Sequence, residues 1–171
     1  LQAEPLNAAA THLLGMLRYK QGQHQDAISL IKRSISISPI AASYSNLSLV
    51  QFKAKLFAEA EESAARAIQL DPQYRKAYVH LGWSLLKLKK SEQAVECFRR
   101  AIELQPNSPS NWNNLAIALM DALREEEAVE VLRRALALDP NYVEALGNLG
   151  KTLGACGQPE QGIEVLLKAR S

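Results

Sequence analysis

The sequence predicts an all-α fold, a solenoid of antiparallel helix pairs, and two observations lead to this class. The first is the stretch Arg75–Ser108, in which two apolar stripes of helical period are separated by a break at Lys89–Ser91. The second is that the features of this stretch recur with a period of 33 or 34 residues. The prolines that close successive copies are Pro39, Pro72, Pro106 and Pro140. Such a period indicates an array in which each repeat packs only on its neighbours.

Three columns of the repeat hold small residues, which let two helices approach closely because a larger side chain would hold the backbones apart. With Arg75 as position 1, position 8 is Gly15, Ser48, Gly82, Ala116 and Gly150. Position 20 is Ala27, Ala60, Ala94, Ala128 and Gly162. Position 27 is Ser34, Ala67, Ala101, Ala135 and Ala169. The proline at position 32 cannot extend the preceding helix, and it presets a turn.

Five repeats are expected, each with a first and a second helix. Their boundaries are 8–40, 41–74, 75–108, 109–142 and 143–171, with the last one truncated, and together they form one solenoid domain. Residues 1–7 are expected to be the tail of a preceding repeat, because Pro5 lies 34 residues before Pro39. The chain is therefore expected to be a piece of a longer array.

Local signals in four of the repeats mark where helices begin and end. Gly22 predicts a turn between the helices of repeat one, whereas repeat two has Lys55 where glycine is usual. Repeat four begins with Pro109, which is tolerated in the first turn of a helix. In repeat five, the glycines and the proline of 154–159 predict a clear break between the two helices.

The spacing resembles that of the tetratricopeptide repeat, whose signature has a large residue, Leu-Gly, Ala, a second large residue, Ala and Pro. In repeat three these places are taken by Tyr78, Leu81, Gly82, Ala94, Phe98, Ala101 and Pro106. The resemblance covers about residues 8–171. It implies a right-handed superhelix in which first helices line a concave groove and second helices form the outer face. It also implies a scaffold that binds a protein or peptide partner in that groove.

Composition and charge narrow the class of partner. The 171 residues are 47% hydrophobic and 22% charged, which is typical of a globular protein. No apolar run approaches the roughly 20 residues needed to cross a bilayer, so no membrane segment is expected. The net charge of +2 gives no argument for binding nucleic acid.

The residues that could carry chemistry are few and scattered. His12, His24 and His80 have no Cys, His or carboxylate partner at metal-ligand spacing, and no glycine loop of the phosphate-binding kind is present. We therefore expect no catalytic residue, no metal and no cofactor, so this part of the protein is not expected to be an enzyme. Cys97 and Cys156 are expected to be separate reduced thiols, in keeping with a cytoplasmic location.

Position 6 of the repeat supplies the first group of candidate binding residues. It reads Leu13, Asn46, His80, Asn114 and Asn148. Three asparagines in one column resemble the asparagine ladder of the O-linked N-acetylglucosamine transferases and their bacterial relatives. An asparagine amide can both donate to and accept from a peptide bond, so such a ladder would hold an extended peptide by its backbone. The alternative is that asparagine is simply common in this column.

Positions 9 and 13 supply the other candidates. At position 9, the apolar residues Met16, Leu49, Trp83 and Ile117 are expected to contact apolar side chains of the partner. At position 13, Lys20, Lys53 and Lys87 are expected to contact acidic groups. Residues 1–90 hold 12 Lys or Arg and 6 Asp or Glu, whereas residues 91–171 hold 8 and 12. An acidic segment of a ligand would therefore be steered to the first half, unless these charges are only solvated faces.

Two other functions remain open. The array is alternatively the substrate-recognition arm of a larger enzyme, such as a glycosyltransferase, whose catalytic domain lies outside these residues. It is otherwise a scaffold that self-associates through unsealed ends, because Val165, Leu166 and Leu167 are followed by no polar capping helix. A chaperone receptor with a two-carboxylate clamp is not expected, because only Asn46 and Lys76 match the five residues of that clamp.

Overall fold

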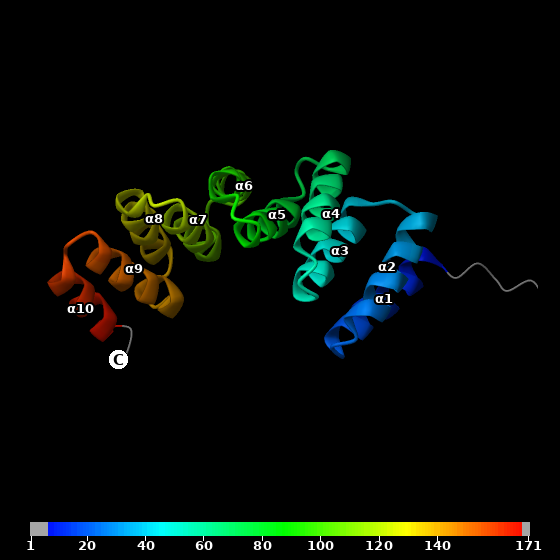
Figure 1. Cartoon of the computed structure of the whole chain (residues 1–171), viewed down its shortest axis with the longest axis horizontal. Helices are drawn as coiled ribbons and strands as arrows, with labels where there is room; N and C mark the ends of the chain where they lie inside the picture. Colours follow the sequence, from blue (N-terminus) through cyan, green and yellow to red (C-terminus); the bar gives the residue numbers. More distant parts are fainter. Residues whose placement is uncertain (1–6, 169–171) are drawn as a thin grey trace, which may run out of the picture. The chain divides into compact units, whose positions relative to one another are not determined.

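The computed structural model describes residues 7–168, and the secondary structure of this part is helical throughout, as the sequence predicts (Figure 1). The first helices of the five repeats are α1 (Ala8–Lys20), α3 (Ala41–Lys53), α5 (Arg75–Lys87), α7 (Pro109–Asp121) and α9 (Val143–Ala155). The second helices are α2 (His24–Ile37), α4 (Phe57–Leu70), α6 (Ser91–Leu104), α8 (Glu125–Leu138) and α10 (Pro159–Lys168). Pro5, Ala169 and the expected tail in residues 1–6 lie outside the described residues.

The helices group into two compact units that divide after Leu88. In unit 1, α1 packs on α2, α3 packs on α4, and α5 lies against both α3 and α4. In unit 2, α6 packs on α7, α7 on α8, α8 on α9, and α9 on α10. Each helix therefore contacts mainly its neighbours in sequence, which is the packing that a repeat array requires.

The small-residue columns lie where helices touch, which confirms their expected role. A Cβ atom added to Gly15 would stand 2.8 Å from the Ile31 side chain. A Cβ atom on Gly162 would stand 2.6 Å from the backbone oxygen of Gly150, which is closer than real Cβ atoms come. Gly162 therefore replaces the alanine of the other repeats because α9 and α10 approach more closely than an alanine allows. The fully buried alanines at position 20 are Ala27, Ala60, Ala94 and Ala128.

Serine is accommodated in the same columns because its hydroxyl finds a partner on the facing helix. The Ser48 hydroxyl donates to the carbonyl oxygen of Ala60 at 2.7 Å, and the Ser34 hydroxyl donates to that of Ala8 at 2.7 Å. Both side chains are buried, so an unpaired hydroxyl there would be costly. The two bonds tie α3 to α4 and α1 to α2.

The turn between the two helices of every repeat contains one residue with a left-handed backbone, at position 15. Two are glycines, Gly22 with φ 78° and Gly157 with φ 75°. The other three are Lys55 with φ 64°, Lys89 with φ 61° and Leu123 with φ 59°. A side chain in this conformation costs free energy that glycine does not pay. The five repeats thus share a single turn geometry although their turn sequences differ.

Aromatic residues at position 4 secure the start of two first helices. The Tyr78 hydroxyl donates to the carbonyl oxygen of Pro72 at 3.2 Å, and the Trp112 indole donates to that of Pro106 at 2.8 Å. In both cases the acceptor is the proline at position 32 of the preceding repeat. These bonds fix the connection between one repeat and the next within unit 1 and within unit 2.

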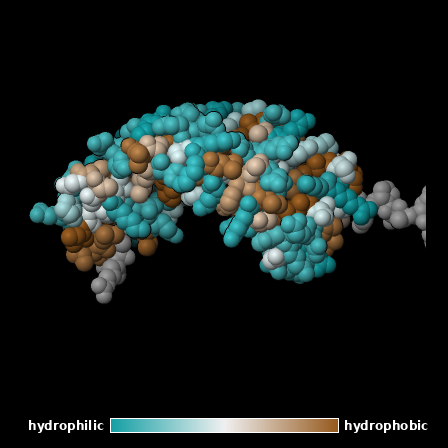
Figure 2. Space-filling view, viewed as in Figure 1, coloured by the Kyte–Doolittle hydropathy of each residue, from teal (hydrophilic) through white to brown (hydrophobic). Residues whose placement is uncertain are grey.

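Some apolar side chains on the first and last described helices remain exposed. Leu13, Leu14 and Leu17 are exposed on α1, and Ile163 and Leu167 are exposed on α10. Figure 2 shows hydrophobic surface over the α10 end of unit 2. Among residues 7–168, no helix has both the length and the apolar character needed to span a membrane. Self-association through these helices stays a prediction.

Candidate functional site

A hollow of about 520 Å³ lies between α3 and α5 in unit 1, and it brings together five of the predicted binding residues. Its lining residues are Leu49, Phe52, Lys53, Val79, His80, Trp83 and Lys87. Leu49 and Lys53 lie one turn apart on α3, and His80, Trp83 and Lys87 follow the same spacing on α5, so each set shares one helix face. We call this site the α3–α5 hollow.

The α3–α5 hollow combines an apolar floor with a cationic edge. Leu49, Val79 and Trp83 are half-buried, whereas Lys53 and Lys87 are exposed. Long lysine side chains cover apolar surface with their stems while the ammonium groups stay in water. The arrangement can accept an apolar side chain and place carboxylates beside it against the two ammonium groups.

The charge around the hollow has a single sign on the first helices of unit 1. Helices α1, α3 and α5 contain six Lys or Arg residues and no Asp or Glu. The cations are Arg18, Lys20, Lys53, Arg75, Lys76 and Lys87. In contrast, α4 carries Glu59, Glu61 and Glu62 with Arg66. Four of these six cations lie on α3 and α5, the two helices that form the hollow.

His80 is held in one tautomer by α3. Its Nδ1 lies 2.9 Å from the backbone oxygen of Ser45 and 2.9 Å from the Ser45 hydroxyl. A carbonyl oxygen can only accept, so Nδ1 carries the proton and donates to it. Burial lowers the pKa of His80 to about 4, and the nearby cations Lys76 and Arg75 act in the same direction. The ring is therefore neutral at pH 7, with Nε2 as an unprotonated acceptor.

A related bond joins α1 to α3. The Asn46 amide Nδ2 donates to His12 Nε2 at 2.9 Å, and His12 Nδ1 lies 3.2 Å from the Ser43 hydroxyl. Burial lowers the pKa of His12, which favours the neutral ring that this pattern needs. The Asn46 amide thus forms part of the contact between repeats one and two, and its contact with a ligand stays a prediction.

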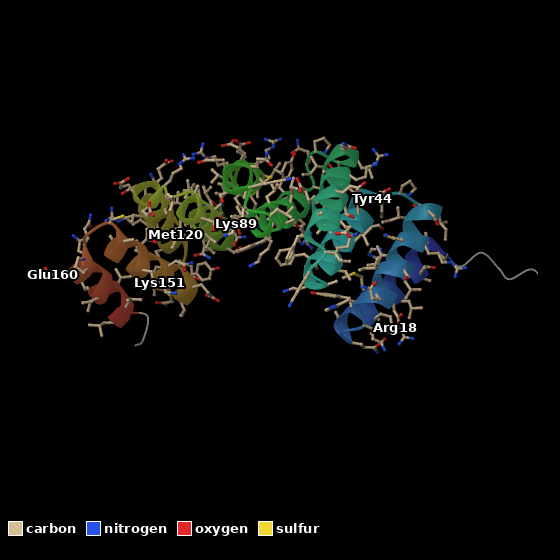
Figure 3. The ribbon with its side chains drawn as sticks, in the orientation of Figure 1. Arg18, Tyr44, Lys89, Met120, Lys151 and Glu160 are labelled. Carbon is tan, nitrogen blue, oxygen red and sulfur yellow. The ribbon has the colours of Figure 1, made fainter. Side chains whose placement is uncertain are left out.

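The same pairing occurs in unit 2, between α7 and α9. The Asn148 amide Nδ2 donates to Asn113 Oδ1 at 2.8 Å. The Thr152 hydroxyl donates to the sulfur of Met120 at 3.2 Å. Figure 3 labels Met120 on α7 and, on α9, Lys151, which precedes Thr152 in the sequence. The predicted residues Asn114 and Ile117 are half-buried on α7.

The sequence reasoning did not anticipate that position 6 bonds to position 5 of the preceding repeat. The pairs are His12 with Asn46, Ser45 with His80, and Asn113 with Asn148. Reading the two columns together, offset by one repeat, would have shown that each pair can form a hydrogen bond. Two asparagines of the predicted ladder therefore also hold successive repeats together.

Two further predicted residues lie on α1. Met16 is half-buried and packs against a core cluster that includes Ile28, Ile31 and Val50. Lys20 is exposed in the last turn of α1, where a cation suits the helix dipole. Their contact with a ligand stays a prediction.

A second hollow, of about 570 Å³, lies on unit 1 between α2 and α4, and the sequence reasoning missed it. The Ser63 hydroxyl donates to Gln51 Oε1 at 2.7 Å in its wall, and both side chains are buried. Lys32 and Arg66 lie at its edge with glutamates of α4, and Tyr44, labelled in Figure 3, also lines it. The mixed charges of this hollow distinguish it from the α3–α5 hollow.

The described residues offer few groups for cofactor or redox chemistry. Between residues 7 and 168, no three His, Cys, Asp or Glu side chains lie close enough together to hold a metal ion. Within the described part of the chain, neither Cys97 nor Cys156 forms a disulfide. Burial raises the pKa of Cys156, and the acidic residues Glu126 and Glu125 raise it further.

Comparison with solved structures finds the same fold in several proteins. A MamA crystal structure is 20% identical, covers 91% of this chain and 91% of its own, and has a TM-score of 0.83. A MamA fragment from Desulfovibrio magneticus RS-1 is 16% identical over 99% of this chain and 96% of its own, with a TM-score of 0.88. YrrB, described as a TPR protein with an unusual peptide-binding site, is 20% identical over 97% and 86%, with a TM-score of 0.79.

Comparison with models of protein families identifies the family of the sequence. Comparison with curated protein sequences gives no match. Models of the tetratricopeptide repeat, or TPR, match residues 12–75, 76–108, 97–130 and 124–169. These matches together run from residue 12 to residue 169 and agree with the fold of the solved structures. The chain belongs to the tetratricopeptide repeat family.

Proposed function

We propose that the protein is a peptide-binding scaffold and that unit 1 binds an acidic segment of a partner protein in the α3–α5 hollow. The partner segment places an apolar side chain in the hollow and carboxylates beside Lys53 and Lys87. The observation that carries this proposal is the coincidence of an apolar hollow with first helices that hold six cations and no anion.

Each part of the α3–α5 hollow has a separate role in this binding. Trp83 is the largest side chain that lines the hollow, and tryptophan is enriched among residues that dominate binding energy. The lysines attract the ligand over a distance and select its sign of charge, so binding weakens as salt is added. Tetratricopeptide repeats with acidic first helices would lack this selection.

The test uses a short fluorescent peptide, Asp-Asp-Phe-Asp-Asp, and fluorescence anisotropy. We expect the wild type to bind it and to bind Lys-Lys-Phe-Lys-Lys at least tenfold more weakly. We expect Lys53→Ser/Lys87→Ser to weaken binding by roughly tenfold, since two exposed charge pairs contribute up to about 1 kcal/mol each. Trp83→Ala is expected to weaken it by about thirtyfold, the effect of a binding hot spot.

The matched control is Lys32→Ser/Arg66→Ser, which removes the same charge from the α2–α4 face. This variant is expected to bind the acidic peptide like the wild type, and thermal melts establish that all variants are folded. If it weakens binding as much as Lys53→Ser/Lys87→Ser does, net charge alone drives the interaction. Equal binding of acidic and basic peptides would also exclude the proposal.

A further inference from the structure

The tautomer of His80 adds a chemical requirement to the α3–α5 hollow. The Nδ1–H group is used by the Ser45 backbone oxygen, 2.9 Å away. Nε2 is then a neutral acceptor on a ring that lines the hollow together with apolar side chains such as Leu49 and Trp83. A polar group of this kind loses its hydrogen bond to water when a ligand covers it, unless the ligand supplies a donor.

Charge and size limit which donor can be supplied. Lys53 and Lys87 edge the hollow, and Arg75 and Lys76 lie near the His80 ring, so a cationic side chain of the ligand is repelled. Serine and threonine offer little apolar surface to contact Leu49, Val79 and Trp83. An aromatic ring that carries one O–H or N–H group satisfies both the apolar walls and the single acceptor.

We infer that the α3–α5 hollow selects an acidic segment whose central residue is tyrosine or another donor-bearing aromatic, with its O–H or N–H donated to His80 Nε2. This inference rests on the proposed function, because it names the side chain that occupies the same hollow. His80 is the specificity-determining residue, and Lys53 and Lys87 bind the flanking carboxylates irrespective of the central residue.

The experiment compares Asp-Asp-Tyr-Asp-Asp with Asp-Asp-Phe-Asp-Asp, which differ by one hydroxyl. We expect the tyrosine peptide to bind about two- to tenfold more tightly to the wild type, the range of one net hydrogen bond. In His80→Leu, which keeps an apolar wall without the acceptor, the two peptides should bind with equal affinity. His80→Phe serves as a second variant of larger size, so that failure of one variant to fold leaves the comparison intact.

A second readout tests the tautomer without any ligand. Nitrogen-15 NMR of the histidine rings distinguishes a protonated Nδ1 from a protonated Nε2, and we expect a proton on Nδ1 of His80. A proton on Nε2 at neutral pH would overturn the inference, since the hollow would then offer a donor.

The outcomes separate the inference from the proposed function. If both peptides bind wild type equally, and Lys53→Ser/Lys87→Ser weakens both, the proposed function stands and the role of His80 is rejected. If the preference for tyrosine persists in His80→Leu, the donor binds elsewhere and the inference is again rejected. If neither peptide binds wild type, both the proposed function and the inference fail.

Discussion

The left-handed turn residues at position 15 allow one prediction about stability to be tested in both directions, by introducing a glycine in one repeat and removing a glycine in the next. Leu123 has φ 59° and an exposed side chain, with a relative exposure of 80%, so replacing it removes almost no packing. Replacing leucine by glycine removes the cost of the left-handed backbone, which is about 1–2 kcal/mol. The greater freedom of glycine in the unfolded chain offsets about 0.5–1 kcal/mol of this stabilisation. Leu123→Gly should therefore stabilise the protein by about 0.5–1 kcal/mol.

The reverse substitution is Gly157→Ala in the next repeat. Gly157 has φ 75°, and a Cβ atom there would meet no atom within 4 Å, so the cost is purely conformational. We expect Gly157→Ala to destabilise the protein by about 1 kcal/mol. Leu123→Ala is the control for the lost side chain, because it keeps both a Cβ atom and the left-handed backbone.

The assay is thermal and urea unfolding followed by circular dichroism. A change of 1 kcal/mol shifts the melting temperature by about 2–4 °C in a protein of this size. We expect the midpoint to rise for Leu123→Gly, fall for Gly157→Ala and change little for Leu123→Ala. A fall for Leu123→Gly, or an unchanged midpoint for Gly157→Ala, would refute the reasoning that backbone conformation sets the residue preference at position 15.

Three other predictions concern stability. Because burial lowers the pKa of His80 to about 4 from 6.5, the unfolded chain binds its proton more readily between these values, and stability should fall as the pH drops through this window. The loss in the free energy of unfolding is at most about 3 kcal/mol. Urea unfolding should show a shallower pH dependence of stability for His80→Asn than for the wild type, and parallel pH curves for the two proteins would contradict the assignment. Gly162→Ala should destabilise the protein by about 1–3 kcal/mol, because the new Cβ atom meets the Gly150 backbone, and an unchanged thermal midpoint would show that the helices can separate at little cost. Trp112→Phe keeps the ring but loses the hydrogen bond to Pro106, so the free energy of unfolding should drop by about 1 kcal/mol; no change would mean that water replaces the bond without loss.

The features that repeat along the chain were predictable from sequence. A small residue at position 20 has the same cause in every copy, so the alignment of Ala27 with Ala60 and Ala94 reveals its role. Gly162 looked like an irregularity in that column, and the structure gives its reason in the close approach of Gly150. Periodicity therefore predicted the fold and the packing columns because these depend on local spacing.

The details of the candidate site depend on contacts between repeats. Each contact joins residues at two different repeat positions, so it cannot be inferred from one position alone. Asn46, His80 and Asn148 belong to one column, but their partners His12, Ser45 and Asn113 have three different chemistries. The tautomer of His80 follows from a backbone oxygen of α3, which the sequence alone does not place. The sequence predicted the residues Leu49, Trp83 and Lys87, while the hollow that unites them required coordinates.

The turn of repeat two shows a third case, in which the sequence left the backbone conformation open. Lys55 stands where glycine is usual, and its backbone adopts the same left-handed conformation as that of Gly22. Packing of the two helices on either side fixes the turn, and the local preference of lysine is overridden. Sequence preference is a weak guide wherever tertiary packing sets the backbone.

The hydrogen bonds between position 5 of one repeat and position 6 of the next limit how freely the repeats can be exchanged. Each bond needs a matched donor and acceptor, and the three described pairs use three different combinations of side chains. A duplication of repeat two would add a junction in which Ser45 of the first copy lies beside Asn46 of the second, a pair that the present chain does not contain. The contact between two repeats is thus specific to that pair, so evolution or design must change two neighbouring repeats together to alter the hydrogen bond that joins them.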